Sequence, residues 1–326
     1  MASVGVVAIG RNEGERLRRC LQSLLPARVP IVYVVSASTD GSIDLARGLG
    51  VDVVSLDLSI PFTAARARNA GLQRLRQIDP TLELVQFVDG DCEVAPGWID
   101  RAAEALRDDA TLAVVCGRRR EAHPEHSIWN RLCDIEWDTP IGEAAACGGD
   151  ALMRVAAFQQ VGGFDESLIA GEEPDLCLRL RRAGWRIRRI DAEMTLHDAA
   201  MLRFGQWWKR AVRAGHAYAE GAARHGRGPE RHWVRERRRI LFWGFGLPLV
   251  VAVGLVFCWP WPLLALALYP LQALRIAWRA RRRVGSGLAL AFGVACLAAK
   301  FPEFVGLLRY TLRRSGREPG RIIEYK

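Results

Sequence analysis

Phe87-Val88-Asp89-Gly90-Asp91-Cys92-Glu93-Val94 is the stretch of this chain that decides its fold. Residues 84–88 form a short apolar run that ends at an Asp-Gly turn, and this pattern predicts a buried strand. Asp89 and Asp91 would then lie at the carboxyl end of that strand. In an open parallel sheet the ligand crevice lies outside this edge, and two carboxylates one residue apart suit Mg²⁺ or Mn²⁺ carrying phosphate oxygens. Asp-Gly-Asp is also an ordinary turn sequence, so the motif alone leaves both interpretations open.

The composition is that of a globular chain with an excess of positive charge. The 326 residues are 50% hydrophobic, which excludes a disordered protein and allows one large domain with an appendage. The formal net charge of +10 fits nucleic acid, an anionic membrane or a phosphorylated substrate. The eight cysteines include no Cys-x-x-Cys pair, so we expect reduced thiols without a zinc site or a disulfide framework. The amino-terminal residues lack the features of a signal peptide, and we expect a cytosolic catalytic domain.

Apolar runs and amphipathic segments alternate through the first part of the chain. The runs that predict strands are residues 4–9, 31–35, 51–56, 84–88 and 112–116, and helices are predicted between them, for example at 63–77 and 98–106. This alternation indicates a doubly wound parallel sheet. Neither Gly-x-Gly-x-x-Gly nor Gly-x-x-x-x-Gly-Lys-Ser/Thr occurs, so the common dinucleotide and P-loop interpretations lack support.

Two predicted helix starts carry charged side chains. Arg66 and Arg68 have the charge and fork geometry that phosphate oxygens require, although such a pair is also typical of a solvated basic face. Gly171-Glu172-Glu173-Pro174-Asp175 opens another helix, where acidic residues also serve as partners of the helix dipole. Each motif alone is therefore ambiguous.

Taken in chain order, the motifs resemble glycosyltransferase family 2. They are Ala8-Ile9-Gly10-Arg11-Asn12-Glu13, Ser38-Thr39-Asp40-Gly41-Ser42, Ala67-Arg68-Asn69-Ala70-Gly71, Asp89-Gly90-Asp91, Gly162-Gly163-Phe164-Asp165 and Glu172-Glu173-Pro174-Asp175-Leu176-Cys177-Leu178-Arg179, within about residues 1 to 220. The resemblance implies a GT-A fold, which is an α/β structure with a doubly wound mixed sheet. It also implies a nucleotide-diphosphate sugar donor, a divalent metal ion (Mg²⁺ or Mn²⁺) and inversion at the anomeric carbon.

The resemblance also assigns roles to residues of this chain. Asp91, together with Asp89 and His197, would hold the metal ion. Glu173 would be the catalytic base, with Glu172 as the alternative. The residues implied in nucleotide-sugar binding are Ala8, Arg11, Asn12, Glu13, Ser38, Asp40, Arg68, Asn69, Asp89 and Gly90. Trp137, Gly149 and Asp150 would lie on the acceptor or sugar side, although a core position for Trp137 is equally consistent with the sequence.

The implied mechanism is a single displacement. The metal ion and Arg68 would neutralise charge on the leaving diphosphate while the base takes the proton of the attacking hydroxyl. Two positions differ from the family pattern: the loop Val35-Ser36-Ala37-Ser38 lacks acidic residues, and the base is Glu rather than Asp. The nucleotide therefore stays open. A membrane-anchored module of the same fold that binds a nucleotide sugar or saccharide without catalysis is the alternative function.

The composition changes from Phe204 onward. A basic, aromatic helix and an arginine-rich segment precede residues 240–259, an uncharged apolar run of about the 20 residues that a bilayer core requires. Residues 261–278 form a second apolar segment. Because arginines flank this pair, we expect a hairpin with both ends in the cytoplasm, and a soluble core helix pair is the alternative. Residues 288–308 contain Lys300, Pro302 and Glu303, which predicts an interfacial helix.

These patterns predict the domain organisation and the setting of the protein. We expect a GT-A catalytic domain at 1–225, a basic juxtamembrane linker at 226–239, a transmembrane hairpin plus interfacial helix at 240–310, and a basic cytoplasmic tail at 311–326. The protein would lie in the inner (cytoplasmic) membrane with its catalytic domain facing the cytoplasm, and would not bind nucleic acid. A polyprenyl-linked or other saccharide acceptor in envelope or exopolysaccharide synthesis is expected by analogy. The processive polysaccharide synthases of the family carry a Gln-x-x-Arg-Trp signature. Residues 206–210 match only part of it, which favours transfer of a single sugar over polymerisation.

Overall fold

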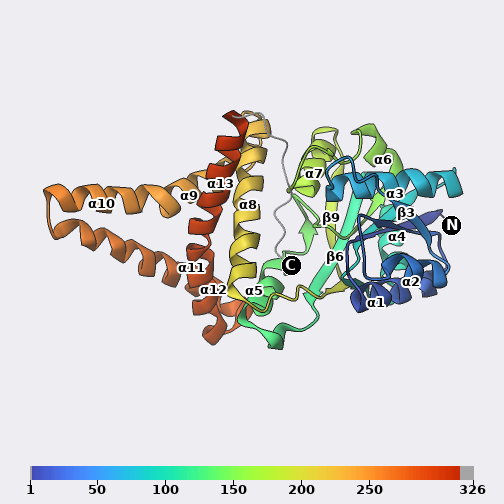
Figure 1. The fold of residues 1–326 in the computed structure, drawn as a ribbon, viewed down its shortest axis with the longest axis horizontal. Helices are drawn as coiled ribbons and strands as arrows, with labels where there is room; N and C mark the ends of the chain where they lie inside the picture. Colours follow the sequence, from blue (N-terminus) through green and yellow to red (C-terminus); the bar gives the residue numbers. More distant parts are fainter. Residues whose placement is uncertain (1, 316–326) are drawn as a thin grey trace. The chain divides into compact units, whose positions relative to one another are not determined.

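The computed structural model describes residues 2–315, which divide between Ala200 and Met201 into two compact units. Figure 1 shows the ribbon. The elements of the first unit are β1 (Val4–Gly10), α1 (Glu15–Leu24), η1 (Leu25–Ala27), β2 (Ile31–Val35), α2 (Ser42–Gly48), β3 (Asp52–Ser55), α3 (Ala64–Ile78), β4 (Leu84–Asp89), β5 (Cys92–Val94), α4 (Trp98–Asp108), β6 (Leu112–Glu121), η2 (Pro124–His126), α5 (Ile128–Trp137), β7 (Gly142–Glu143), β8 (Ala151–Arg154), α6 (Val155–Gln160), α7 (Glu172–Arg182) and β9 (Arg186–His197).

The first unit is built on one nine-stranded sheet with the strand order β3-β2-β1-β4-β8-β6-β9-β5, and β7 pairs with β9. Strands β3, β2, β1 and β4 are parallel, whereas β8 runs antiparallel to both β4 and β6. The mixed sheet implied by the family resemblance is therefore confirmed. The wholly parallel sheet indicated by the alternation of elements is wrong at β8, β5 and β7, which run antiparallel to their neighbours, whereas β6 runs in the direction of β4 and pairs in parallel with β9. Strand β8 follows the long excursion through α5 and β7 and enters between β4 and β6 in the opposite direction.

Helices cover both faces of this sheet (Figure 1). Helix α3 packs so closely on β1 that a Cβ at Gly71 would lie 2.3 Å from Val7 Cγ1. Val7 and Phe87 are register partners, so their side chains lie on this same face. Gln86 points to the opposite face, where its Oε1 accepts a 2.9 Å hydrogen bond from Trp98 Nε1 at the start of α4. Both faces of the central strands are thus buried.

The carboxyl ends of the parallel strands lie side by side. Ile9 of β1 is the register partner of Asp89 in β4, and the backbone N–H of Gly90 donates to the carbonyl of Ile9 at 2.7 Å. A Cβ on Gly90 would lie 3.1 Å from that carbonyl oxygen, so a side chain here would press on the neighbouring strand. The Asp89–Asp91 turn is therefore held directly against the loop that follows β1.

The second unit is helical (Figure 1). Its elements are α8 (Phe204–His225), α9 (Val234–Leu241), the π-helical turn η3 (Phe242–Gly246), α10 (Leu247–Phe257), η4 (Trp261–Ala267), α11 (Leu268–Val284), α12 (Ser286–Ala298) and α13 (Lys300–Ser315). Helices α8 and α13 pack closely at glycines. A Cβ at Gly215 would lie 2.0 Å from the carbonyl oxygen of Glu303, and one at Gly306 would lie 2.0 Å from that of Val212. The chain turns back after α10, and η4 packs against it.

Two helical runs of the described residues are long and apolar enough to cross a membrane, Val234–Phe257 and Ser286–Arg314. Only 17% and 28% of their apolar windows are buried. The second run includes the segment expected to be interfacial, where the Lys300 and Glu303 side chains form an ion pair at 2.5 Å. The expected second limb of the hairpin, 261–278, is divided between η4 and α11 and is not among these runs.

Observed boundaries differ from the expected ones. The first compact unit ends at Ala200, ahead of the predicted boundary at 225, because α8 packs against α13 within the second unit. The expected basic linker becomes helical at Val234 and continues into the apolar run. Of the tail predicted at 311–326, residues 316–326 lie outside the described part of the chain.

Candidate active site

The loops after β1 and β2 are joined by hydrogen bonds. The Asn12 N–H donates to Ser38 Oγ at 3.0 Å, and Asn12 Oδ1 accepts from the Thr39 N–H at 2.8 Å. Asp40 Oδ2 accepts from the Gly14 N–H at 2.8 Å. These bonds hold Asn12 at a φ of 54°, a conformation that non-glycine residues seldom adopt. Three residues predicted to bind the nucleotide therefore form one braced rim, which we call the nucleotide rim (Asn12, Ser38 and Asp40).

Other predicted nucleotide-binding residues lie around this rim. Arg11 is exposed, and Glu13 pairs with Arg16 at 2.8 Å. Gly90 lies within reach of Glu13, because a Cβ there would be 3.4 Å from Glu13 Cγ. Ala8 is fully buried inside β1, so its side chain lies away from any ligand at this edge.

Arg68 has a different place from the one expected. Its guanidinium is bonded on one side to Asp89 Oδ1 at 2.7 Å and on the other to Glu172 Oε1 at 2.9 Å, and its side chain is only 3% exposed. In this structure Arg68 therefore bridges two carboxylates. This bridge ties the Asp-Gly-Asp turn to the start of α7.

Asn69 is likewise engaged inside the protein. Its amide nitrogen donates to the Phe164 carbonyl and to Glu166 Oε1, both at 2.9 Å, and its Oδ1 accepts from the Phe164 N–H at 3.1 Å. The side chain expected to touch the nucleotide sugar therefore fastens α3 to the Gly162–Asp165 loop instead.

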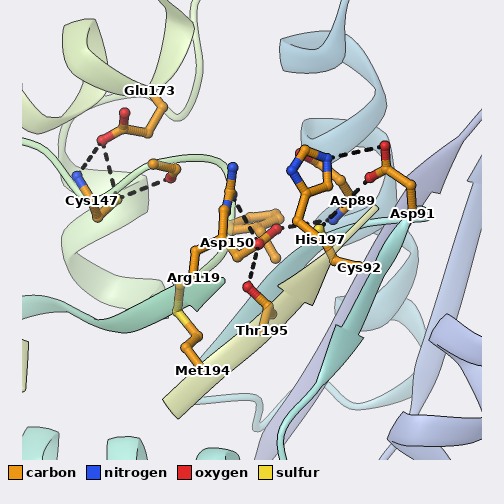
Figure 2. Close-up of polar contacts among 12 residues, drawn as sticks. Asp89, Asp91, Cys92, Arg119, Cys147, Asp150, Glu173, Met194, Thr195 and His197 are labelled. Atoms are coloured by element: carbon orange, nitrogen blue, oxygen red, sulfur yellow. Dashed lines mark hydrogen bonds and ion pairs between the residues drawn. The ribbon is translucent and has the colours of Figure 1, made fainter. Parts of the chain in front are cut away.

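Asp150 is fully buried, so the predicted contact with a sugar hydroxyl does not fit its position. Its Oδ1 accepts from the Asp89 N–H at 3.1 Å, while Oδ2 accepts from Thr195 Oγ1 at 2.8 Å and lies 2.8 Å from Arg119 Nη2 (Figure 2). Burial, the largest single effect, lowers the pKa of Arg119, but nearby negative groups, first Asp150, raise it above its ordinary value overall. The guanidinium therefore stays charged and faces a buried carboxylate.

Gly149 lies where these charged groups crowd together. A Cβ at this position would be 2.9 Å from Asp89 Oδ2, 3.0 Å from Arg68 Nη2 and 3.3 Å from Arg119 Nη2. The absence of a side chain lets the loop approach all three. Gly149 therefore shapes the site through its backbone.

Asp91 and His197 form the group best suited to a metal ion (Figure 2). His197 Nε2 lies 3.1 Å from Asp91 Oδ2, and both side chains are nearly completely buried. Burial, and then the charge of Arg119, lower the pKa of His197 to about 4, so at neutral pH the imidazole has the free electron pair that a metal ligand needs. The ring packs on Trp137 with centroids 4.7 Å apart. A carboxylate and a neutral imidazole within one ion's reach are able to hold a divalent metal ion.

Asp89, the third expected metal ligand, is engaged by Arg68, as described above. Beside Asp91 lies Cys92 instead, with its Sγ 3.7 Å from Asp91 Oδ1. Burial raises the pKa of Cys92 well above its usual range, so this thiol stays protonated and is a poor ligand for a hard ion.

Glu173 lies in a separate pocket of donors. Its Oε1 accepts from the Cys147 N–H at 2.6 Å, and the thiols of Cys147 and Cys177 lie 3.1 and 2.9 Å from it. The two sulfur atoms are 3.7 Å apart, and all eight cysteines of the chain are free. Burial raises the pKa of Cys177 to about 11, so it meets the carboxylate as a neutral S–H donor. The Glu173 carboxylate is thereby oriented by three donors.

Four residues of this site were absent from the sequence-based predictions: Arg119, Thr195, Cys147 and Cys177. The run Arg118-Arg119-Arg120 did offer a signal for Arg119, because side chains alternate between the faces of a strand and at least one of these three arginines must turn inward. Thr195 and the two cysteines carry no such signal. They meet their partners only through the pairing of β6, β8 and β9 and the packing of α7.

Comparison with known proteins gives a consistent picture of the family. Residues 5–162 match the family model described as Glycosyl transferase family 2. The chain is 29% identical over 302 residues to the pre-mycofactocin glycosyltransferase of Mycobacterium tuberculosis, and 27% identical over 197 residues to the succinoglycan biosynthesis protein ExoA of Rhizobium meliloti. The matches cover 88% and 55% of this chain and 58% of each relative's length, so the chain spans well under two thirds of these proteins.

A solved structure shares the fold. The mannosyltransferase PcManGT from Pyrobaculum calidifontis, in complex with GDP-Man and Mn²⁺, superposes with a TM-score of 0.60 at 19% identity. The superposition covers 91% of this chain and 86% of that protein. The GT-A architecture expected from the motifs is thereby confirmed.

Proposed function

Because residues 5–162 match the model of glycosyltransferase family 2, we propose that this chain moves a sugar, with inversion, from a nucleotide-diphosphate sugar to an acceptor hydroxyl. The observation that carries the proposal is the meeting of Asp91 and His197, 3.1 Å apart, at the carboxyl edge of the central strands. The mannosyltransferase of the same fold binds GDP-Man and Mn²⁺, which supports both a nucleotide-sugar donor and a divalent ion.

On the donor side, Asp91 and His197 would hold Mg²⁺ or Mn²⁺. When bound, this ion supplies positive charge against the diphosphate that departs. The nucleotide rim would bind the base and ribose, with Asp89 beside it. Arg68 and Arg119 would support this site indirectly. Their contacts with Asp89 and Asp150 hold the Asp-Gly-Asp turn in one geometry.

On the acceptor side, Glu173 is the proposed base. Three donors hold its Oε1, which leaves Oε2 to take the proton of the acceptor hydroxyl. Glu172, the alternative, is bonded to Arg68, and this contact favours Glu173. Attack from the face opposite the diphosphate in one displacement inverts the anomeric carbon. Trp137, half-buried beside His197, would form the wall against a sugar ring.

We further propose that the protein resides in the inner membrane, with the catalytic domain in the cytoplasm and a polyprenyl-linked or other saccharide as acceptor. Its two candidate spans have apolar windows that are only 17% and 28% buried, unlike the core helices of a soluble protein. The similarity to a succinoglycan biosynthesis protein supports an acceptor in exopolysaccharide or envelope assembly.

The test is release of nucleoside diphosphate by the full chain in detergent, with a panel of nucleotide sugars and acceptors in the presence of Mn²⁺. Glu173→Gln should lower kcat by roughly 100-fold or more while donor affinity is unchanged, since a general base acts only in the chemical step. Asp91→Asn should lose metal-dependent donor binding. Glu104→Gln, an exposed change on α4, is the matched control and should be neutral. If Glu172 proves essential and Glu173 dispensable, the catalytic base is Glu172 and not Glu173.

The alternative function is a binding module of the same fold without catalysis, which the non-acidic loop Val35–Ser38 favours. Calorimetry separates the two. Tight Mn²⁺-dependent binding of a donor without turnover across the panel would support the module, and equal donor affinity with and without Mn²⁺ would overturn the metal site.

A further inference from the structure

The second unit contains a pocket of about 480 Å³ whose lining residues all belong to that unit. Its lining includes four arginines (Arg231, Arg235, Arg238 and Arg239), one acid (Glu230) and two aromatic residues (Phe242 and Trp243). The lining therefore carries a formal surplus of positive charge. Such a combination of guanidinium groups and aromatic rings is typical of a site for an anion that has an apolar part.

The arginines of this pocket are not neutralised by the protein. Arg235, Arg238 and Arg239 are exposed, and none has an ion pair with another of the residues 2–315. Their spacing of three and four residues places them on one side of α9. Like charges at this spacing repel one another, so a bound anion would relieve that repulsion. Guanidinium groups that are free to form paired hydrogen bonds suit phosphate oxygens best.

The position of the pocket identifies the kind of anion. Helix α9 continues through η3 and α10 as the apolar run Val234–Phe257, so the arginines come immediately before a candidate membrane span. Phe242 and Trp243 follow one turn later, where aromatic side chains are favoured at a membrane surface. Trp243 is fixed there, because its carbonyl accepts a 2.6 Å hydrogen bond from Tyr269 Oη and the two rings lie 5.5 Å apart.

From this arrangement we propose that the pocket binds the phosphate group of an anionic membrane lipid, with Arg235, Arg238 and Arg239 on the phosphate and Phe242 and Trp243 against the start of the acyl chain. The inference rests on the membrane location put forward under the proposed function. An anion at the depth of the lipid headgroups meets the arginines without leaving the bilayer, whereas a soluble phosphate would gain nothing from the aromatic side of the pocket. The lipid is either a bulk phospholipid or a polyprenyl phosphate.

The experiment is calorimetric titration of the full chain in a non-ionic detergent with four probes: short-chain phosphatidylglycerol, short-chain phosphatidylcholine, a polyprenyl phosphate and inorganic phosphate. Saturable binding is expected for at least one of the two anionic lipids, and which of them binds more tightly identifies the source. In the variant R235Q/R238Q/R239Q this affinity should fall roughly 100-fold, as losing about 1 kcal/mol for each arginine at a membrane surface predicts.

The control variant is R281Q/R282Q/R283Q, which removes the same charge from the end of α11 and should change the affinity less than about threefold. Gel filtration checks that both variants remain folded. The proposal is overturned if both triple variants lose binding equally, if phosphatidylcholine binds as well as the anionic lipids, or if inorganic phosphate alone matches them.

Failure of this inference is distinguishable from failure of the proposed function. With a water-soluble saccharide acceptor in detergent, nucleoside diphosphate release should be the same for the wild type and for R235Q/R238Q/R239Q, because the variant leaves the first unit unchanged. Lipid binding by a chain that shows no transfer would overturn the function and support the pocket. Transfer by a chain that binds no anionic lipid would do the reverse.

Discussion

Asp150→Asn is the substitution that tests most directly how the site is held together. The change keeps the shape of the side chain and an oxygen for Thr195, but it removes the charge opposite Arg119. Breaking a buried ion pair by neutralising one partner costs about 3–5 kcal/mol of unfolding free energy. Asp150 is fully buried and the Arg119 side chain is 14% exposed, so we expect about 3 kcal/mol, the lower end of that range.

The assay is urea unfolding of the full chain in detergent, followed by near-ultraviolet circular dichroism, with Thr195→Val as the comparison. Thr195→Val removes a single 2.8 Å hydrogen bond and should cost about 1–2 kcal/mol. The double variant Asp150→Leu/Arg119→Met removes both charges and should be more stable, by about 2 kcal/mol, than the sum of the single variants Asp150→Leu and Arg119→Met predicts. Strict additivity, or a cost below about 1 kcal/mol for Asp150→Asn, would refute the idea that this pair is a buried, coupled support.

A functional loss should accompany the loss of stability. Asp150 Oδ1 accepts from the Asp89 N–H at 3.1 Å, so its neutralisation loosens the turn that carries Asp91. At a urea concentration where the variant is still folded, its Mn²⁺ requirement for half-maximal transfer should rise by roughly tenfold or more, as weakened support of a metal ligand predicts. An unchanged Mn²⁺ requirement would make Asp150 a purely structural residue.

Three further changes test other parts of the molecule. Gly215→Ala would bring a Cβ within 2.0 Å of the Glu303 carbonyl and should destabilise the chain by about 1–3 kcal/mol in thermal unfolding. The control is Gly205→Ala on the same helix, where a Cβ would have no atom within 4 Å and the change should be neutral or stabilising. Burial and then the charge of Arg313 lower the pKa of His216 to about 4, so the unfolded chain binds more protons at this residue between pH 4 and 6.5, and stability should fall as the pH drops through that window. His216 contributes up to roughly 3 kcal/mol of this fall; His216→Gln should remove that share from the pH profile of unfolding and leave the similar share of His197, whose pKa is also about 4. Cys258 is exposed near the turn after α10, so a membrane-impermeant maleimide applied to intact cells should label the wild type and not Cys258→Ser; labelling only after the membrane is opened would contradict the predicted hairpin.

Much of the fold could be predicted from local sequence. The strands β1, β2 and β4 and the helix α3 begin and end within a few residues of their predicted limits, because apolar runs bounded by turn residues leave few alternatives. The motif order also indicated the similarity to glycosyltransferase family 2 and its fold, since each motif marks the carboxyl end of a strand or the start of a helix. The mixed pairing of β8 could not be read in this way, because strand direction depends on which strands meet after long excursions.

Candidate residues were predicted better than their partners. The order of Asp91, Glu173 and His197 in the motifs indicated a metal pair and a base, and the structure brings His197 to within 3.1 Å of Asp91 across 106 residues of sequence through the antiparallel pairing of β5 and β9. Sequence spacing carries no information about such a pairing.

What the sequence by itself determined is therefore the set of strands, their turn motifs and the apolar runs of the second unit, all of which follow from periodicities of neighbouring residues. Only the tertiary structure decided which polar and charged side chains are engaged inside the protein. Arg68, Asn69 and Asp150 look like ligand contacts as motifs, yet each is buried or bonded within the protein, and Arg119 is the cation that faces Asp150. The physical reason is that a buried charge must be paired inside the fold, and its partner comes from a distant segment that packing alone brings near.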